Sequence, residues 1–396
     1  MFVRKFTAKF ASIQIGLVKT LCFALDFDQK FEVATNIDLY KIANKNTHLN
    51  NHIHMCLYPR LMLNKKYITN KKNNGNIPNI KDERTRYVPI GCGVCIECLK
   101  QKANQWNIRL NEEYKSNNIA QFVTLTFSEE KIKELSEKYT KLNTGILTDP
   151  HQNNELAIFA VRYFLERWRK KHKKSIKHWL VTELGHNGTE RIHLHGLMWT
   201  KEKDEIEKIW QYGWVFIGNY VNESTINYII KYITKIDTKH KWFRPKILCS
   251  PGIGANYTHS HNFKLKKFNQ EKTDESYNFK NGKKGSLPTY YRNKIYSEDE
   301  REKLWIQRLN KEERWVRGTK IDISKGLDEY YKIRDYHRER NVAMGYGHID
   351  TNEKKDKKNL SDIKKITNIA TTSHTLTSEA TDNYHKNKDL DSNLNF

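Results

Sequence analysis

Two adjacent strand-like segments constrain the fold of this chain more than any other feature. Residues 178–184 and 191–200 are apolar, β-branched or aromatic at many positions, and the turn 185–188 between them contains glycine and asparagine. This pattern predicts an antiparallel hairpin. The segment 121–127 alternates apolar and polar side chains and predicts a further half-buried strand.

Two helices are predicted around these strands. Residues 157–173 have apolar side chains at helical spacing, and 222–236 form a second helix with Asn222 or Ser224 as its N-cap. A short strand is expected at 214–219. The order strand, helix, strand, strand, helix predicts an α+β fold, an antiparallel sheet with flanking helices. We expect the helices to pack on one face of the sheet and to leave the other face open.

The chain is strongly basic. Its 396 residues include 70 Lys and Arg against 46 Asp and Glu, a formal net charge of +24, and 12% are aromatic. Such a composition is typical of proteins that act on nucleic acid. No segment approaches the roughly 18 apolar residues of a membrane span, which excludes integral membrane proteins, and we expect no membrane partner. A basic helix is predicted over 99–117, with a solvated face.

A histidine pair in the second strand of the hairpin is a candidate metal site. His193 and His195 are two residues apart, so both imidazoles project from the same face of the strand. Imidazole binds several first-row divalent ions. Glu183 on the neighbouring strand is the candidate third ligand, and Glu190 is its rival. The alternative is a pair of surface histidines on a solvated strand.

The second predicted helix carries a stripe of phenols and ammonium groups. Tyr228, Lys231, Tyr232 and Lys235 fall at i, i+3, i+4 and i+7, and isoleucines occupy the opposite stripe. Two outward tyrosines beside lysines are candidate nucleophiles, although a free phenol, with a pKa of about 10, reacts slowly without activation. The alternative is a tyrosine pair that packs on a neighbouring segment.

Four cysteines are candidate zinc ligands. Cys92, Cys95 and Cys98 have the tight spacing of a zinc knuckle, and Cys56 is the nearest fourth ligand. A shared ion would fold residues 55–99 into a small module. The alternative is a set of reduced thiols without metal.

Taken together, these elements resemble the HUH superfamily of endonucleases. They resemble most closely the replication initiator proteins of microviruses, the gokushovirus-like single-stranded DNA phages. The resemblance covers residues 55–346. It rests on Phe-Val-Thr-Leu-Thr-Phe at 122–127, Glu183 ahead of Arg-Ile-His-Leu-His-Gly at 191–196, Tyr-Ile-Ile-Lys-Tyr-Ile-Thr-Lys at 228–235, and two further segments at 251–255 and 287–294.

The resemblance implies an organisation of the chain. It implies an RRM-like core within an HUH endonuclease domain over 100–259, after a cysteine-rich module over 55–99. A basic, aromatic region follows over 260–346. We expect 1–54 to be a dispensable extension and 347–396 to be a disordered tail, because the tail has few apolar residues.

The resemblance also implies a function and roles for residues. The metal Mg²⁺ or Mn²⁺ falls to His193, His195 and Glu183, the nucleophiles are Tyr228 and Tyr232, and Lys231 assists them. The implied activity is rolling-circle replication initiation by metal-dependent nicking and rejoining of a single-stranded phage origin through a 5′-phosphotyrosine. It implies the host bacterial cytoplasm as location, and the host replication helicase and polymerase as partners.

Three further residues are expected to contact DNA: Lys235, Thr124 and Thr126. Two alternatives to the nicking function remain open. One is a non-catalytic zinc-containing nucleic-acid-binding protein, which would need no tyrosine nucleophile. The other is an HUH plasmid initiator or transposase.

Overall fold

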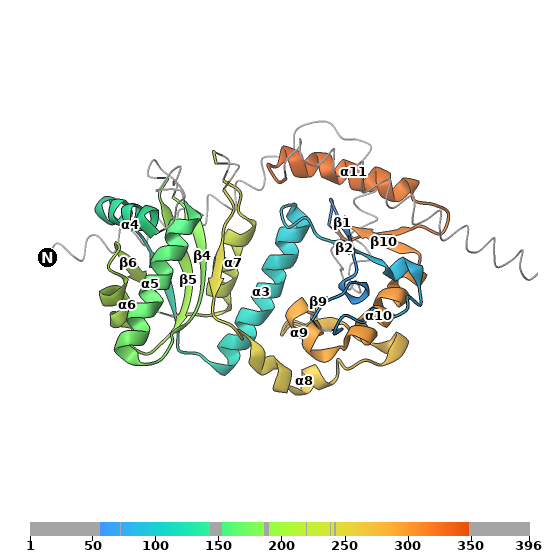
Figure 1. The fold of residues 1–396 in the computed structure, drawn as a ribbon, viewed down its shortest axis with the longest axis horizontal. Coiled ribbons are helices and arrows are strands. Elements are labelled where there is room, and N and C mark those ends of the chain that lie inside the picture. Colours follow the sequence, from blue (N-terminus) through green and yellow to red (C-terminus); the bar gives the residue numbers. More distant parts are fainter. Residues whose placement is uncertain are drawn as a thin grey trace, which may run out of the picture. The chain divides into compact units, whose positions relative to one another are not determined.

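The computed structural model describes residues 56–71, 73–142, 153–185, 190–218, 220–237, 239–240 and 243–347 (Figure 1). All of these residues belong to one compact unit, Asn51–Phe396. The expected extension over 1–54 and the expected tail over 347–396, apart from Gly347, lie outside the described residues. Among the helices of the described part, none combines the length and the apolar character needed to cross a bilayer.

A five-stranded antiparallel sheet forms the centre of the fold. From one edge to the other, its strands are β6 (Val215–Ile217), β3 (Ala120–Leu125), β5 (Ile192–Trp199), β4 (Lys177–Leu184) and β7 (Ile247–Cys249). The predicted hairpin is present as β4 and β5, and the two other predicted strands are present as β3 and β6. The edge strand β7 is one that the sequence does not predict. The hairpin register pairs Glu183 with His193 and Val181 with His195.

Three helices contribute to the core on one face of this sheet: α4 (Glu129–Leu142), α5 (Asn154–His172) and α6 (Lys203–Trp210). Phe164 and Trp168 of α5 are buried there with Val123, Leu125 and Leu194 of the sheet. In Figure 1, α5 lies across β4 and β5. The first predicted helix is therefore confirmed, and the alternation of buried residues along the strands is the reason that it packs here.

The opposite face, which we expected to be open, is covered by α3 (Ile96–Ser116) and α7 (Glu223–Thr234), so that expectation is wrong. Trp179 and Leu197 project from this face and are fully buried. They pack against the isoleucines of α7 and against Leu110 of α3. Exposed apolar surface costs about 25 cal/mol per Å², which explains why two helices pack on this face. The expected solvated basic helix, α3, is therefore largely a packing element.

The start of α7 is fixed by its capping residues. Of the two candidate N-caps, Asn222 is the one in the structure. Its side-chain oxygen accepts a hydrogen bond from the Thr225 backbone N–H at 2.9 Å, and the Thr225 hydroxyl accepts one from the Asn222 backbone N–H at 3.3 Å. This reciprocal capping box satisfies N–H groups that the helix itself leaves unpaired. It therefore sets where the helix begins and which residues face the sheet.

The cysteine-rich segment shares its core with the C-terminal part of the chain. Leu57, Cys95 and Ile96 are buried together with Val316 and Tyr330. The elements involved are two short antiparallel sheets and one long helix, β1 (Arg60–Leu63) with β2 (Tyr87–Ile90), β10 (Glu313–Val316) with β11 (Thr319–Asp322), and α11 (Asp328–Ala343). Two 3₁₀ turns lie between β1 and β2, η1 (Lys65–Tyr67) and η2 (Glu83–Thr85).

The remaining elements form an aromatic core against α3. Ile108 of α3 is buried with Tyr257, Tyr277, Leu287 and Tyr291. These residues come from a run of short elements, η4 (Ala255–His259), α8 (His261–Lys264), η5 (Gln270–Lys272), the hairpin of β8 (Ser276–Asn278) and β9 (Lys284–Ser286), α9 (Thr289–Ile295) and α10 (Glu298–Asn310). Residues of α3 therefore belong to the core under the sheet and to this aromatic core.

Candidate catalytic and metal-binding sites

Glu183, His193 and His195 converge at the end of the β4–β5 hairpin. The Glu183 Oε2 atom lies 3.3 Å from His193 Nε2 and 3.1 Å from His195 Nε2. One ligand atom from each of the three residues lies within 4.8 Å of the others. The structure therefore brings together the three predicted ligands. The rival carboxylate, Glu190, instead contacts His240, with 3.0 Å between Oε2 and Nε2.

The far nitrogen of each imidazole has its own partner. His195 Nδ1 lies 2.9 Å from the hydroxyl of Thr124, and His193 Nδ1 lies 3.2 Å from the backbone carbonyl of Arg191. Hydrogen bonds at one ring nitrogen fix the orientation of the ring and leave the other nitrogen for a metal. Thr124 reaches His195 because the two residues are paired in the β3–β5 register. The sequence alone does not predict this contact.

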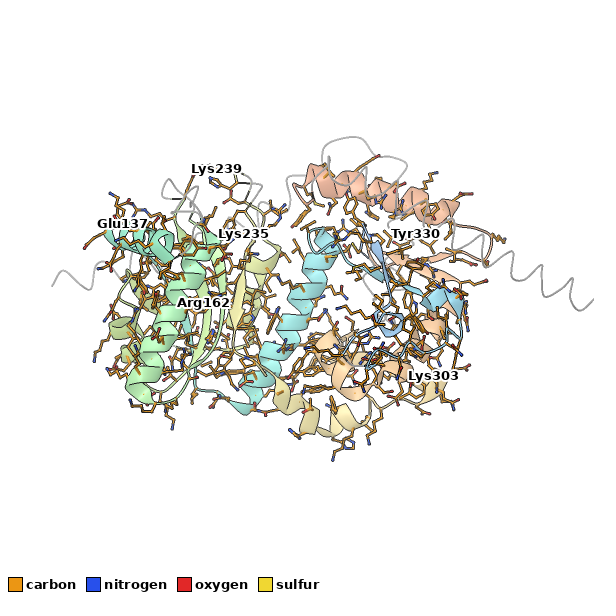
Figure 2. All side chains as sticks on the ribbon, in the orientation of Figure 1. Glu137, Arg162, Lys235, Lys239, Lys303 and Tyr330 are labelled. Carbon is orange, nitrogen blue, oxygen red and sulfur yellow. The ribbon has the colours of Figure 1, made fainter. Side chains whose placement is uncertain are left out.

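The Glu183 carboxylate is buried but strongly stabilised as an anion. Burial raises its pKa, and hydrogen bonds from His193, His195 and Lys235 more than offset this, so its pKa lies below its usual range. Lys235, labelled in Figure 2, is the C-cap of α7 and forms an ion pair with Glu183. Burial lowers the pKa of His195, although Glu183 opposes this effect. A lowered pKa favours the neutral imidazole that a metal requires.

The geometry of these three side chains fits a divalent ion. Neighbouring ligand atoms around an octahedral ion with bonds of about 2.1 Å lie about 3.0 Å apart. The separations of 3.1 and 3.3 Å from Glu183 Oε2 to the two imidazole nitrogens agree with this value. Two imidazoles and one carboxylate on one side of an ion leave its other positions to a substrate. The residues present can therefore hold a metal and still accept a phosphate.

The two tyrosines of α7 adjoin this cluster in different ways. The Tyr232 ring is only 8% exposed and stacks on the His195 ring, with centroids 4.5 Å apart and an angle of 8°. The Tyr228 side chain is 49% exposed. The Tyr232 hydroxyl donates a hydrogen bond to the Tyr228 hydroxyl oxygen at 2.6 Å. The expectation that both phenols point outward is wrong for Tyr232, because α7 packs against the sheet.

The remaining predicted site residues have different surroundings. Lys231 is exposed on α7, and its ammonium group has no hydrogen bond or ion pair with the described residues. Lys235, rather than Lys231, is the lysine that contacts the Glu183 carboxylate. The Thr126 hydroxyl donates to the backbone carbonyl of Trp214 at 2.8 Å. DNA contact by Thr124, Thr126 and Lys235 stays a prediction.

Exposed aromatic rings extend from Tyr228 to the edge of the sheet. Trp214 is 60% exposed and Phe216 is 41% exposed, and their ring centroids are 5.9 Å apart. Phe122 on β3 lies between them and the site, with its centroid 6.2 Å from both Phe216 and Tyr228. Apolar residues at alternate positions 214 and 216 are the sequence signal for such a surface. The sequence analysis used them only to predict a strand.

The four cysteines form a second candidate metal centre. The sulfur atoms of Cys56 and Cys95 are 3.8 Å apart, and those of Cys92 and Cys98 are 3.9 Å apart. Tetrahedral zinc with bonds of about 2.3 Å to sulfur requires separations of about 3.8 Å. All four residues are free of disulfides. The predicted ligand set is therefore assembled with the spacing that zinc requires.

Backbone N–H groups also point at these sulfur atoms. Cys56 Sγ accepts hydrogen bonds from the N–H groups of Tyr58 and Cys92 at 3.3 and 3.1 Å. Cys92 Sγ accepts one from the Cys95 N–H at 3.3 Å. The turn between them needs Gly93, whose φ of +79° lies in the left-handed region. Such N–H donors favour thiolate over thiol, which is the form that binds zinc.

A comparison with known protein families gives one match. The family model for the replication-associated protein ORF2 matches residues 120–237. The matched segment begins at β3 and includes the Glu183, His193 and His195 cluster and both tyrosines of α7. The match is consistent with a replication initiator of single-stranded DNA phages or viruses, as the sequence analysis expected. No curated protein and no solved structure matches the chain.

Proposed function

We propose, from the match of residues 120–237 to replication-associated proteins, that this chain initiates replication by cutting and rejoining single-stranded origin DNA. One observation carries the proposal. Within the matched segment, the phenol of Tyr232 stacks directly on His195, which belongs to the cluster with Glu183 and His193. A pair of phenols beside a divalent-metal site is the arrangement needed for attack of a tyrosine on a bound phosphate.

We assign Mg²⁺ or Mn²⁺ to Glu183, His193 and His195 because the three donor atoms have suitable separations. When bound, such an ion polarises a non-bridging oxygen of the scissile phosphate. Thr124 and the carbonyl of Arg191 hold the two imidazoles in orientation. Lys235 balances the charge of Glu183. The fold proposed for this domain is an HUH endonuclease with an RRM-like core.

In the proposed reaction the Tyr228 oxygen attacks the phosphorus atom. A bond from phosphorus to the tyrosine oxygen forms, and the bond from phosphorus to the 3′ oxygen breaks. The 3′ oxygen takes a proton, and the products are a 5′-phosphotyrosine and a free 3′-hydroxyl. The Tyr232 hydroxyl, which donates to the Tyr228 oxygen, stabilises negative charge on it before the attack. We retain Lys231 as a further source of positive charge.

Rejoining uses the same groups in the reverse sense. A host polymerase extends the 3′-hydroxyl, and after one circuit the origin sequence is regenerated. The second tyrosine then cuts the new origin, and the released 3′-hydroxyl attacks the first phosphotyrosine to close a circle. The spacing of the two phenols, one helical turn apart on α7, allows both to reach one phosphate.

The surroundings of the site support a single-stranded substrate. Exposed Trp214 and Phe216 offer flat rings on which unpaired bases can stack, and the chain has a net charge of +24. We assign a structural zinc ion to the four cysteines, because their sulfur atoms have tetrahedral separations. We place the protein in the cytoplasm of a bacterial host, with the origin of a microvirus-like phage, the host helicase and the host polymerase as partners.

A covalent adduct assay tests the proposal. Labelled single-stranded origin DNA is incubated with the protein and Mn²⁺ and resolved on a denaturing gel. Wild type should form an adduct, and the double variant Tyr228→Phe/Tyr232→Phe should form none. Tyr220→Phe is a matched control, because Tyr220 is 72% exposed and lies outside the cluster. An adduct of equal yield in the double variant, or none in wild type, would refute the nicking mechanism and favour a protein that only binds nucleic acid.

A further inference from the structure

A cavity of about 430 Å³ lies between α3, the first turns of α7 and the β8–β9 hairpin. Its volume falls in the range of about 300–1,000 Å³ that is typical of ligand sites. Polar amides, ammonium groups and aromatic rings dominate its walls, and the lining residues include Asn104, Asn107, Asn111, Asn227, Lys115, Lys280, Lys283, Lys284, Tyr277 and Phe279. The cavity is separate from the Glu183, His193 and His195 cluster.

The asparagines of this cavity are not explained by folding. Asn104, Asn107 and Asn111 occupy one face of α3, and asparagine is a weak helix former. The Asn107 Nδ2 atom donates to the Asn227 Oδ1 atom at 2.5 Å, which joins the two helices. The Asn111 Oδ1 atom is buried and has no hydrogen-bond partner in the described part of the chain. An unpaired buried acceptor destabilises a fold by about 1–3 kcal/mol, so these amides are better explained by a ligand.

The opposite wall of the cavity supplies positive charge and an aromatic ring. Lys283 and Lys284 are exposed on the β8–β9 hairpin, and Lys280 forms an ion pair with Glu223 of α7 at 2.8 Å. Phe279 is half-buried and lies over Gly285, where a Cβ atom would approach the Phe279 ring to 2.8 Å. The glycine therefore allows the ring to lie flat against the hairpin. Ammonium groups near a ring and amides suit a nucleotide.

We propose that this cavity binds an unpaired base of the DNA strand, with adenine preferred. Asparagine amides pair with the N6 and N7 edge of adenine. Phe279 supplies a stacking surface, and Lys283 and Lys284 bind the neighbouring phosphates. Asn227 directly precedes Tyr228 in α7, so the base lies close to the cut. The inference rests on the proposed function and adds to it a residue set that selects where the origin is cut.

Binding measurements with two homopolymers test this inference. Fluorescence anisotropy compares oligodeoxyadenylate and oligodeoxythymidylate of equal length on the full chain. Wild type should bind the adenine polymer at least about fivefold more tightly. Asn107→Ala/Asn227→Ala should remove this difference and leave thymine binding unchanged. Asn118→Ala is the matched control, because Asn118 is exposed just beyond α3 and does not line the cavity.

A second variant separates base recognition from phosphate binding. Lys283→Ala/Lys284→Ala lies on an exposed hairpin and should weaken binding to both polymers, with a salt dependence reduced by about one unit per lysine. Equal wild-type affinity for both polymers, or a preference that survives in the asparagine variant, would overturn the inference. Circular dichroism of each variant shows that it is folded. The adduct assay is independent: an adduct without base preference retains the proposed function and rejects the cavity, and a preference without an adduct does the reverse.

Discussion

The hydroxyl of Tyr232 donates a hydrogen bond to the hydroxyl oxygen of Tyr228 across 2.6 Å. The bond makes the two phenols unequal. Burial raises the pKa of Tyr232, and its bond to Tyr228 and the nearby charge of Glu183 raise it further. Tyr232 therefore keeps its proton and acts as a donor, while the exposed Tyr228 presents its oxygen to a substrate.

This inequality predicts the order in which the two tyrosines react. Tyr228→Phe should abolish the first covalent adduct. Tyr232→Phe should still form it, about ten- to a hundredfold more slowly, because one hydrogen bond to a charged oxygen is lost. Single-turnover kinetics with each variant measure this. An adduct that survives in Tyr228→Phe but is lost in Tyr232→Phe would reverse the order.

Removal of the shared carboxylate should eliminate metal binding. Glu183 is the residue that both imidazoles approach, so Glu183→Gln should lower Mn²⁺ affinity by more than about tenfold and prevent adduct formation. Binding of single-stranded DNA should change little. Titration of the protein with Mn²⁺, followed by electron paramagnetic resonance, measures the affinity. Glu190→Gln is the control, because Glu190 contacts His240 instead; equal losses in both variants would argue against the assigned ligand set.

The fate of Thr124 separates two roles for this residue. The sequence analysis expects Thr124 to contact DNA, whereas its hydroxyl lies 2.9 Å from His195 Nδ1. If it positions the imidazole, Thr124→Val should reduce Mn²⁺ affinity about 10- to 100-fold and leave DNA affinity measured with EDTA unchanged. Thr124→Ser should restore metal binding. A variant that loses DNA affinity but retains Mn²⁺ affinity would support the DNA contact.

Much of this site follows from local patterns in the sequence. The period of two along a strand places His193 and His195 on one face, and a hairpin with a short turn brings Glu183 opposite them. The contact between Thr124 and His195 depends on the register of β3 against β5, which are far apart in the sequence. The burial of Tyr232 depends on α7 packing against the sheet. Neither is encoded in a local period, so neither could be predicted.

The same distinction applies to the rest of the fold. The spacing of the cysteines predicts their shared centre, and their sulfur atoms do lie together. Their core, however, includes Val316 and Tyr330, which are more than two hundred positions away along the chain. Isolated short strands such as β7 carry too few residues to show a period. Contacts of this kind arise from the tertiary structure alone.

Removal of one cysteine should destabilise the fold through loss of zinc. Cys56 lies on the segment that precedes β1, whereas the other three ligands lie at or near the start of α3. Cys56→Ser should reduce the zinc content and lower Tm by at least about 5 °C, because metal binding contributes to folding. Elemental analysis and thermal unfolding, with and without EDTA, measure both effects. Cys249→Ser is the control, since Cys249 is exposed and outside the cluster; a zinc-free wild type that is insensitive to EDTA would refute the assignment.

Exposed rings on the edge strand should contribute to binding of single strands. Trp214 and Phe216 lie side by side, and Phe122 connects them to Tyr228. Base stacking contributes about 1–3 kcal/mol per base, so Trp214→Ala should weaken binding of single-stranded DNA by about five- to a hundredfold. Duplex DNA of the same sequence has no free base faces, and its affinity should not change. Anisotropy titrations with both forms give the ratio.

The matched control for this prediction is Tyr87→Ala, because Tyr87 is 40% exposed on β2, in the cysteine-rich segment. It should leave both affinities unchanged. A parallel loss for single-stranded and duplex DNA in Trp214→Ala would indicate a general effect on the fold or on phosphate contacts. A loss confined to single strands in Trp214→Ala, and absent in Tyr87→Ala, would place the bound strand across β6 and β3 toward Tyr228.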